Sequence, residues 1–326
     1  MAAQMPLDQV FIVSIWMEAV LYGFLLALTL ASVYINLALH RHQSTHSRIM
    51  FGVGVVMWAI ATVHLSLNCY RLIQGYVIHR DYPGGPSAWF SVLSSWDHVT
   101  KDTLYATQEI LGDAIAIYRA WILWNQDCRI LFPLVVLLIG GTISGYTVCG
   151  TFTEEHGTSN IFDHKLKSWI SAFYAISFVQ SVLTTGLMAY RIWSTERFSA
   201  KYRLDNRSLL PYLRILIESA ALQLIAELIV LALYASGRNA QYILLEALTP
   251  VVGITFNAIT IRIALRSSET FMNMKGEPRQ HTSGYTTRPM RQTIGGSAMP
   301  AQAITINIDQ DIETDARSDA EELDRK

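Results

Sequence analysis

The sequence predicts an all-α membrane protein, a bundle of seven transmembrane helices followed by a polar C-terminal tail. Hydrophobic residues make up 51% of the 326 residues and charged residues only 16%, whereas about 25% of the residues in a soluble domain are charged. Long apolar segments recur from Val13 to Leu265, and Lys and Arg are distributed unevenly between the turns that join them. The composition excludes a soluble enzyme, a disordered chain and a disulfide scaffold. The net charge of −1 gives no basic field for nucleic acid.

A helix needs about 20 mostly apolar residues to cross the hydrocarbon core of a bilayer. Seven segments meet this requirement: Val13–Ala38, Ile49–Ile73, Lys101–Leu123, Ile130–Cys149, Trp169–Tyr190, Leu213–Ser236 and Gln241–Leu265. The third contains Asp102, Glu109 and Asp113, but apolar residues fill the positions between these acids and continue to Trp124. Because backbone polar groups cannot go unpaired in lipid, we expect all seven segments to be helical.

The basic residues predict that the N-terminus lies outside the cell and the C-terminus in the cytoplasm. Thirteen Lys and Arg lie in the last turn of, or after, the first, third, fifth and seventh segments, whereas the loops on the opposite side contain four. Positive residues are retained on the cytoplasmic side of membrane proteins. Tryptophans that fit interfacial belts occur at both sides: Trp89, Trp96 and Trp169 outside, and Trp121, Trp124 and Trp193 inside. We expect an uncleaved, multi-pass protein of the plasma membrane.

Residues 1–266 are therefore expected to form the seven-helix domain, and residues 267–326 a cytoplasmic tail. The tail is rich in Ser, Thr and Gly and turns from basic to acidic. Such a segment buries too little apolar surface to fold, so we predict that it is disordered. The sequon at Asn206 falls in a predicted cytoplasmic loop and is expected to carry no glycan.

Two of the three cysteines, Cys69 and Cys149, are predicted near the outer ends of the second and fourth segments. A disulfide between them can form in an oxidising compartment. The alternative is a pair of thiols that behave as small apolar side chains, and the strict geometry of disulfides favours it.

Ionisable side chains inside the segments mark the candidate functional site, because such groups are costly in lipid and face the bundle interior. Glu18, Asp102, Glu109, Glu227 and Glu246 fall in the outer half, with His64, Asn68 and Lys101 beside them. Asp113 lies near the middle and Glu218 in the inner third. The spacing of seven and four residues places Asp102, Glu109 and Asp113 on one helical face, which should line the bundle.

These residues predict an outward-facing acidic pocket for an unknown small ligand that is cationic or forms hydrogen bonds. The pocket residues are Glu18, His64, Glu109, Asp113, Glu227 and Glu246. Two alternatives stay open: a path for cations or protons, and polar contacts between helices worth about 0.6–2 kcal/mol each. For the group as a whole a pocket is favoured, because Lys101 and His64 cannot neutralise five acids.

Enzyme chemistry and cofactors are not predicted. No Lys lies deep in any segment, which argues strongly against a retinal Schiff base. His64 and Ser66 are two residues apart and do not face each other on a helix. The spacing of His40, His42 and His46 is compatible with a metal, but no Cys or carboxylate is expected nearby, and interfacial basic groups explain it better. There is no nucleotide-binding loop and no nucleophile elbow.

The sharpest local motif is Tyr118-Arg119-Ala120-Trp121-x-x-Trp124, at the cytoplasmic end of the third segment. Its Arg resembles that of the Asp-Arg-Tyr motif of G-protein-coupled receptors, although Tyr118 and Ala120 replace the Asp and the Tyr. The seventh segment has Pro250 and Asn257 in place of Asn-Pro-x-x-Tyr.

From about Ile12 to Arg266 the chain resembles a large group of uncharacterised seven-span membrane proteins from mushroom-type fungi. The matching features are Asp113 before the Tyr118 motif, Pro133, Glu218-Ser219-Ala220, and Gly253-Ile254-x-Phe256 leading to Ile261-Arg262. The resemblance implies a seven-helix fold that is distantly receptor-like, and it supplies no ligand.

The sequence thus predicts a receptor-like protein in which ligand binding shifts the third and sixth segments. Tyr118, Arg119 and Trp121, with the basic loop Arg191–Arg207, would present the coupling surface to a heterotrimeric G protein, and the loop could also bind anionic lipid. The runner-up is a cation- or proton-coupled transporter or channel, which predicts a path to the cytoplasm through Glu218. An intramembrane hydrolase ranks last, because no His–acid cluster is predicted at one depth.

Overall fold

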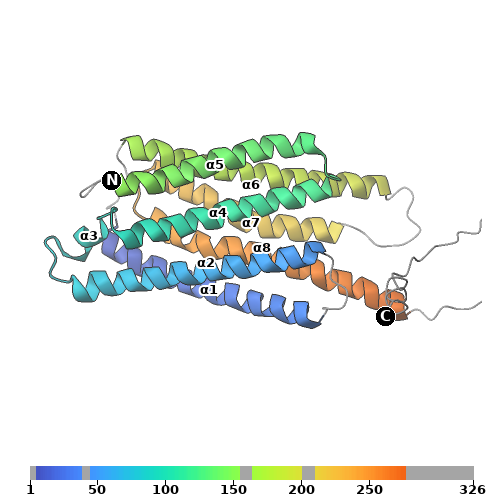
Figure 1. The fold of residues 1–326 in the computed structure, drawn as a ribbon, viewed down its shortest axis with the longest axis horizontal. Helices are drawn as coiled ribbons and strands as arrows, with labels where there is room; N and C mark the ends of the chain where they lie inside the picture. Colours follow the sequence, from blue (N-terminus) through green and yellow to red (C-terminus); the bar gives the residue numbers. More distant parts are fainter. Residues whose placement is uncertain (1–4, 39–44, 155–163, 200–209, 277–326) are drawn as a thin grey trace, which may run out of the picture. The chain divides into compact units, whose positions relative to one another are not determined.

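The structure, a computed structural model, describes residues 5–38, 45–154, 164–199 and 210–276, and it is helical throughout, with no strand in these ranges (Figure 1). Its elements are α1 (Leu7–Ala38), α2 (Thr45–Ile73), the π-helix η2 (Gln74–Ile78), α3 (Gly85–Phe90), α4 (Trp96–Leu123), α5 (Cys128–Glu154), α6 (His164–Ser199), α7 (Leu210–Ala235) and α8 (Gln241–Gly276). The seven predicted segments correspond to the seven long helices, one to each. Most of these helices extend beyond the apolar stretch that predicted them.

Six of the long helices have the length and composition of membrane spans: α1, α2, α5, α6, α7 and α8. Six such helices identify a multi-pass membrane protein. The helix α4 is 28 residues long, but its charged side chains distinguish it from the other six. Eleven of its residues are buried, and they include Asp97, Lys101, Glu109 and Asp113.

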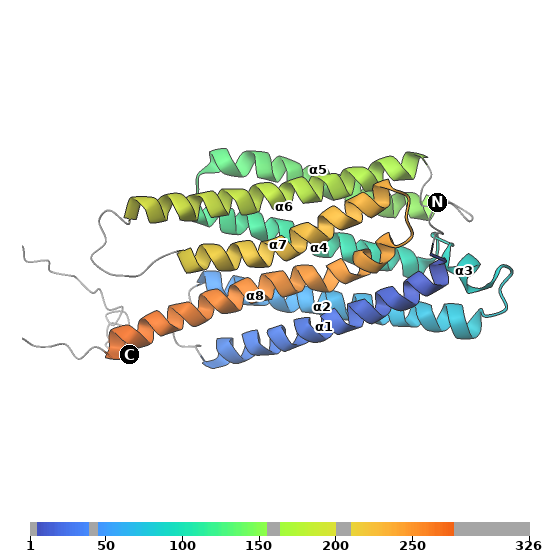
Figure 2. The same ribbon diagram turned by 180° about the vertical axis from the view of Figure 1, so that it is seen from behind.

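The helices α4 and α8 lie at the centre of the bundle formed by the described residues. In α8, 72% of the apolar window is buried, against 17–33% in the other five apolar helices. The helix α8 contacts α1, α2, α4 and α7, and α4 contacts α2, α5, α6 and α8 (Figures 1 and 2). Large apolar side chains such as Trp16, Tyr34 and Phe132 are more than 70% exposed on the peripheral helices. That arrangement suits helices that face lipid.

The end of the bundle that carries α3, here called the α3 end, is closed by aromatic side chains. The ring of Phe90 from α3 stacks on Phe11 of α1 at 4.8 Å between centroids. A Cβ on Gly75 of η2 would lie 2.5 Å from the Phe90 ring, so this approach requires glycine. Neither η2 nor α3 was predicted, because both are too short to register as apolar segments. Together with Tyr105, Phe173 and Tyr242 they form one buried cluster.

Several predictions concern residues at the edges of the described ranges. The helix α8 continues to Gly276, past the end of the predicted segment at Leu265. The remainder of the predicted tail, the sequon at Asn206, and the histidines His40 and His42 lie outside the described residues, as does the side chain of His46.

Candidate functional site

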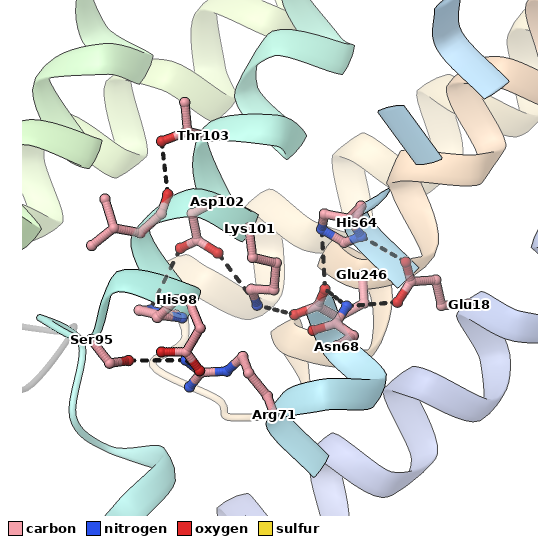
Figure 3. A network of polar contacts seen from close by, with 12 residues as sticks. Glu18, His64, Asn68, Arg71, Ser95, His98, Lys101, Asp102, Thr103 and Glu246 are labelled. Carbon is pink, nitrogen blue, oxygen red and sulfur yellow. Dashed lines mark hydrogen bonds and ion pairs between the residues drawn. The ribbon is translucent and has the colours of Figure 1, made fainter. Parts of the chain in front are cut away.

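The six residues of the predicted pocket fall into two groups at different levels of the bundle. Glu18, His64 and Glu246 belong to an ionic network near the α3 end, together with Asn68, Lys101 and Asp102 (Figure 3). Glu109, Asp113 and Glu227 form a second group, the acidic cluster, farther along α4. The structure therefore brings the predicted residues together in two sets of three.

At the centre of the ionic network, two carboxylates from different helices share one amide. Asn68 on α2 donates to Glu18 Oε2 on α1 and to Glu246 Oε2 on α8, each at 2.7 Å. On the same face of α2, His64 Nδ1 donates to Glu18 Oε1 at 2.6 Å, and its Nε2 lies 3.5 Å from Glu246 Oε2. All four side chains are 1% exposed. The contacts tie α1, α2 and α8 together in the interior.

Lys101 connects this centre to α4. Its ammonium group donates to Glu246 Oε1 and lies 3.3 Å from Asp102 Oδ1. The neighbouring His98 is 3.6 Å from Asp102 Oδ2, also on α4 (Figure 3). Lys101 itself is 1% exposed, and its ammonium lies over the Phe11 ring, 5.8 Å from the centroid. Lys101 therefore contacts both the ionic network and Phe11, one of the aromatic side chains that close the α3 end, here called the aromatic lid (Phe11, Phe90, Tyr105, Phe173 and Tyr242).

A second buried ion pair, missed by the sequence analysis, adjoins the network. Arg71 Nη1 on α2 donates to Asp97 Oδ2 at 2.8 Å and to Ser95 Oγ at 3.0 Å. Arg71 is 2% exposed and stacks over Trp89. The available signal was an arginine in the last turn of an otherwise apolar segment, which normally needs an acidic partner.

The ionic network carries more negative than positive charge. Arg71 balances Asp97, but Glu18, Asp102 and Glu246 face one ammonium group, that of Lys101, and two histidines, His64 and His98, which add positive charge only when protonated. Ligand atoms of Glu18, His64 and Glu246 lie within 4.8 Å of one another, a spacing that could hold a metal ion. Such an ion would have to displace Lys101 and Asn68, which already bind the same carboxylates.

The acidic cluster has no basic partner in the contacts of the described residues. Glu109, Asp113 and Glu227 are 2%, 8% and 6% exposed. Glu227 on α7 accepts hydrogen bonds at Oε1 from Gln223 at 2.8 Å and from Ser181 of α6 at 3.1 Å. Glu109 lies close enough to Asp113 and Glu227 for their charges to interact. Three acids from two helices thus share one buried region.

A pocket of about 60 Å³ opens beside the acidic cluster. Its lining residues come from α4, α6, α7 and α8, and they include Asp113, Arg119, Ser181, Gln223 and Thr255. Of the six predicted pocket residues, only Asp113 lines it. The pocket is large enough for a few water molecules, and it runs from the acidic cluster toward Arg119.

The predicted coupling residues lie at the other end of α4. Arg119 Nη2 donates to Thr260 Oγ1 on α8 at 2.7 Å, and its guanidinium lies 4.5 Å from the centroid of the Phe256 ring. Tyr118 is half-buried against the cluster of Ile115, Val252 and Phe256. The ring of Trp121 is 6.3 Å from that of Tyr118. Arg119 therefore joins the two central helices.

Three polar contacts connect α4 to α8 along their length. Lys101 binds Glu246 near the α3 end, and Arg119 binds Thr260 at the opposite end. Between them, Gln108 Nε2 donates to the backbone carbonyl of Thr249 at 3.2 Å.

Glu218, which the transport hypothesis places on a path to the cytoplasm, lies on the surface. Its side chain is 51% exposed and accepts a hydrogen bond from Arg214 Nε at 2.8 Å, one turn away on α7. Arg262 of α8 is 4.0 Å away. Glu218 is absent from the lining of the pocket.

The cysteines Cys69 and Cys149 are not bridged in the structure. Both are free thiols, Cys69 exposed and Cys149 buried, and Cys128 is free and exposed. In the structure, Cys69 and Cys149 are therefore two separate thiols, which was the alternative to a disulfide.

Comparison of the chain with known proteins finds no relative. The chain matches no protein-family model, no curated protein and no solved structure.

Proposed function

We propose that the chain is a receptor-like membrane protein with seven spans, its N-terminus outside and its C-terminus in the cytoplasm, at the plasma membrane. The seventh span is α4, whose 28 residues extend about 42 Å at 1.5 Å per residue, enough to cross a bilayer. Burial in the centre of the bundle shields its charged groups from lipid. The distribution of Lys and Arg supports the orientation, and the resemblance to seven-span fungal proteins supports the class.

The observation that carries the proposal is the set of three polar contacts between α4 and α8. In the proposed orientation Lys101–Glu246 lies at the outer end and Arg119–Thr260 at the cytoplasmic end. A ligand that competes for Glu246 would loosen the outer contact. Because α4 is a rigid helix, a shift of its outer end displaces Arg119 as well. One pair of helices thus links an outer binding event to the cytoplasmic surface.

The charge balance indicates the ligand chemistry. With His64 and His98 neutral, the ionic network has three carboxylates against one ammonium group, so a cationic ligand would gain from the excess acid. Such a ligand must displace Lys101 from Glu246 or open the aromatic lid around Phe90. A ligand that binds the opened ionic network more tightly than the closed one would shift the protein toward the opened state.

Guanine-nucleotide exchange on heterotrimeric Gα subunits, in membranes that carry the protein, tests the proposal. Arg119→Ala is expected to abolish exchange, because the coupling side chain is gone. Thr260→Val leaves Arg119 in place but removes its acceptor, so basal exchange should rise. Equal exchange from the wild type and both variants would contradict the proposal.

Cation- or proton-coupled transport is the second candidate, and the pocket beside Asp113 favours it. That pocket leads from Asp113, one of the three acids of the acidic cluster, toward the proposed cytoplasmic side. With Glu218 on the surface, the path would pass Arg119 instead, where a fixed positive charge opposes cation passage. Flux into proteoliposomes that stops in Glu109→Gln but persists in Glu218→Gln would favour transport over signalling.

A further inference from the structure

His64 differs from the other groups of the ionic network because both of its ring nitrogens face carboxylates. Nδ1 lies 2.6 Å from Glu18 Oε1 on α1, and Nε2 lies 3.5 Å from Glu246 Oε2 on α8 (Figure 3). The side chain is 1% exposed, so water does not replace either partner. A neutral imidazole carries a proton on one of its two nitrogens, whereas an imidazolium donates from both. The second contact is therefore favourable only when the site holds one additional proton.

The other partners of the two carboxylates place this proton on His64. Asn68 donates to Oε2 of Glu18 and to Oε2 of Glu246, and Lys101 donates to Oε1 of Glu246. With the contact from His64 to Glu18 Oε1, every oxygen of the two carboxyl groups already accepts a hydrogen bond. This pattern suits two ionised carboxylates, which can only accept. A metal ion suits it less well, because it would need the oxygens that Asn68 and Lys101 already bind.

Three helices packed against α2 contribute the charged and titratable groups that face His64: Glu18 from α1, Glu246 from α8 and, from α4, Lys101 with Asp102 and His98 behind it. In the neighbouring η2, the titratable side chain is Tyr76, which donates to the backbone carbonyl of Asp8. Arg71, two turns farther along α2, is paired with Asp97. Loss of the proton from His64 therefore adds one negative charge to a network in which acids already predominate.

Loss of the proton also changes the sign of the contact between α2 and α8. With the remaining hydrogen on Nδ1 and directed at Glu18, the lone pair of Nε2 would face an oxygen of Glu246. The same Glu246 holds Lys101, the outer of the three polar contacts between α4 and α8. Solvent comes closest to the network on the α4 side, where the Asp102 side chain is 16% exposed.

We propose that His64 is a proton-binding site whose occupancy controls the contact of α2 with α8. With the proton bound, His64 bridges Glu18 and Glu246 and holds α1, α2 and α8 together. Without it, Glu246 is repelled and α8 is loosened from α2. In the proposed orientation the site lies in the outer half of the bundle, so the pH outside the cell is an input to the protein. Only the step from this contact to signalling rests on the proposed receptor function.

Nitrogen NMR of the full chain in lipid nanodiscs, with isotope-labelled histidine rings, tests the site directly. The signal that disappears in His64→Gln identifies His64, and His64→Asn serves the same purpose if the first variant does not fold. This ring is expected to carry two protons at about pH 6 and one at about pH 10. A ring that keeps the same number of protons over the whole range would overturn the proposal, whether that number is one or two.

The thermal unfolding midpoint, measured over the same pH range, tests the effect on the helix contact. Proton loss removes a contact from the folded state, so the midpoint of the wild type should fall by a few degrees as the pH rises. His64→Gln should show a clearly smaller fall. His98→Gln is the matched control, because His98 is a buried histidine near the same acids and should leave the fall unchanged. A fall that persists in His64→Gln but is lost in His98→Gln would overturn the proposal.

Guanine-nucleotide exchange at the same pH values separates this proposal from the receptor function. If both hold, the ratio of exchange in the wild type to that in His64→Gln should rise with pH, because deprotonated His64 resembles the neutral variant. Exchange that is absent at every pH, while His64 titrates and the midpoint responds as expected, would contradict the receptor function and support the proton site alone.

Discussion

Lys101 is the residue on which the ionic network depends. Its ammonium group is completely buried and contacts two carboxylates, Glu246 and Asp102. A buried ion pair contributes little net stability compared with an apolar pair of the same shape, but removal of one partner leaves an uncompensated charge. Substitution at this position therefore has a larger effect than its one hydrogen bond suggests.

Lys101→Met is expected to lower the free energy of unfolding by about 3 kcal/mol or more, because Glu246 remains buried without its counter-charge. Thermal unfolding of the purified protein in micelles measures this. Adding Glu246→Gln to the same chain should recover much of the loss.

The control for Lys101→Met is the exposed pair of Arg214 and Glu218. Both side chains are more than half exposed, so their charges are screened by water. Arg214→Met should leave the unfolding midpoint almost unchanged. A drop as large as that of Lys101→Met would show that burial does not govern these pairs.

At the residue scale, the sequence indicates which ionisable side chains are buried, but it does not indicate which of them are in contact with one another. Glu18, His64 and Glu246 are recognisable because each interrupts an apolar segment. Their separation from Glu109 and Glu227 depends on the rotation of each helix about its axis, which packing decides. Asp97 and His98 precede the apolar stretch that predicts the third segment, so hydropathy does not mark them as part of the bundle.

Among the helices, the close approach of α4 to α8 depends on one glycine. A Cβ on Gly112 of α4 would lie 2.7 Å from Cγ1 of Val252 on α8, a buried and β-branched side chain. Small residues at such positions let membrane helices approach closely. The separation of α4 and α8 here also determines whether Gln108 and Arg119 reach their partners.

Gly112→Ala is expected to push the two helices apart and to destabilise the protein by about 1–3 kcal/mol, the usual cost of overpacking. Gly186→Ala on α6 is the matched control, because nothing lies within 4 Å of the added Cβ. The unfolding midpoints of the two variants, compared with that of the wild type, provide the measurement. Equal midpoints for the two variants would contradict the close packing of α4 on α8.

The elements themselves were largely predictable. Every long helix covers one of the predicted segments to within one residue, because length and hydropathy are properties of the chain alone. The helix α4 differs from the other long helices because it is less apolar. Its charged side chains are accommodated by burial against four neighbouring helices. The short elements η2 and α3 depend on packing around Gly75 and Phe90, which hydropathy cannot reveal.

For the whole molecule, the proposed orientation makes a prediction about thiol accessibility. In a chain with Cys69 and Cys149 changed to Ser, a membrane-impermeant maleimide should label Cys128 only after intact cells are permeabilised. Arg80→Cys, in a chain without the other thiols, should be labelled from outside, because Arg80 is exposed beside η2. Labelling of Cys128 in intact cells would invert the topology.

The pairing of Lys101 with Glu246 also has a consequence for biosynthesis. The two residues are 145 positions apart, so α4 leaves the ribosome long before α8 exists. Until then α4 must hold its charges without their partner, and each Asp, Lys or Arg at the centre of a helix opposes insertion by about 2.5–3.5 kcal/mol. Stable entry of α4 into the lipid should therefore wait for the last helix. A chain that ends before Gln241 is expected to leave α4 at the membrane surface, where quality-control proteases can reach it.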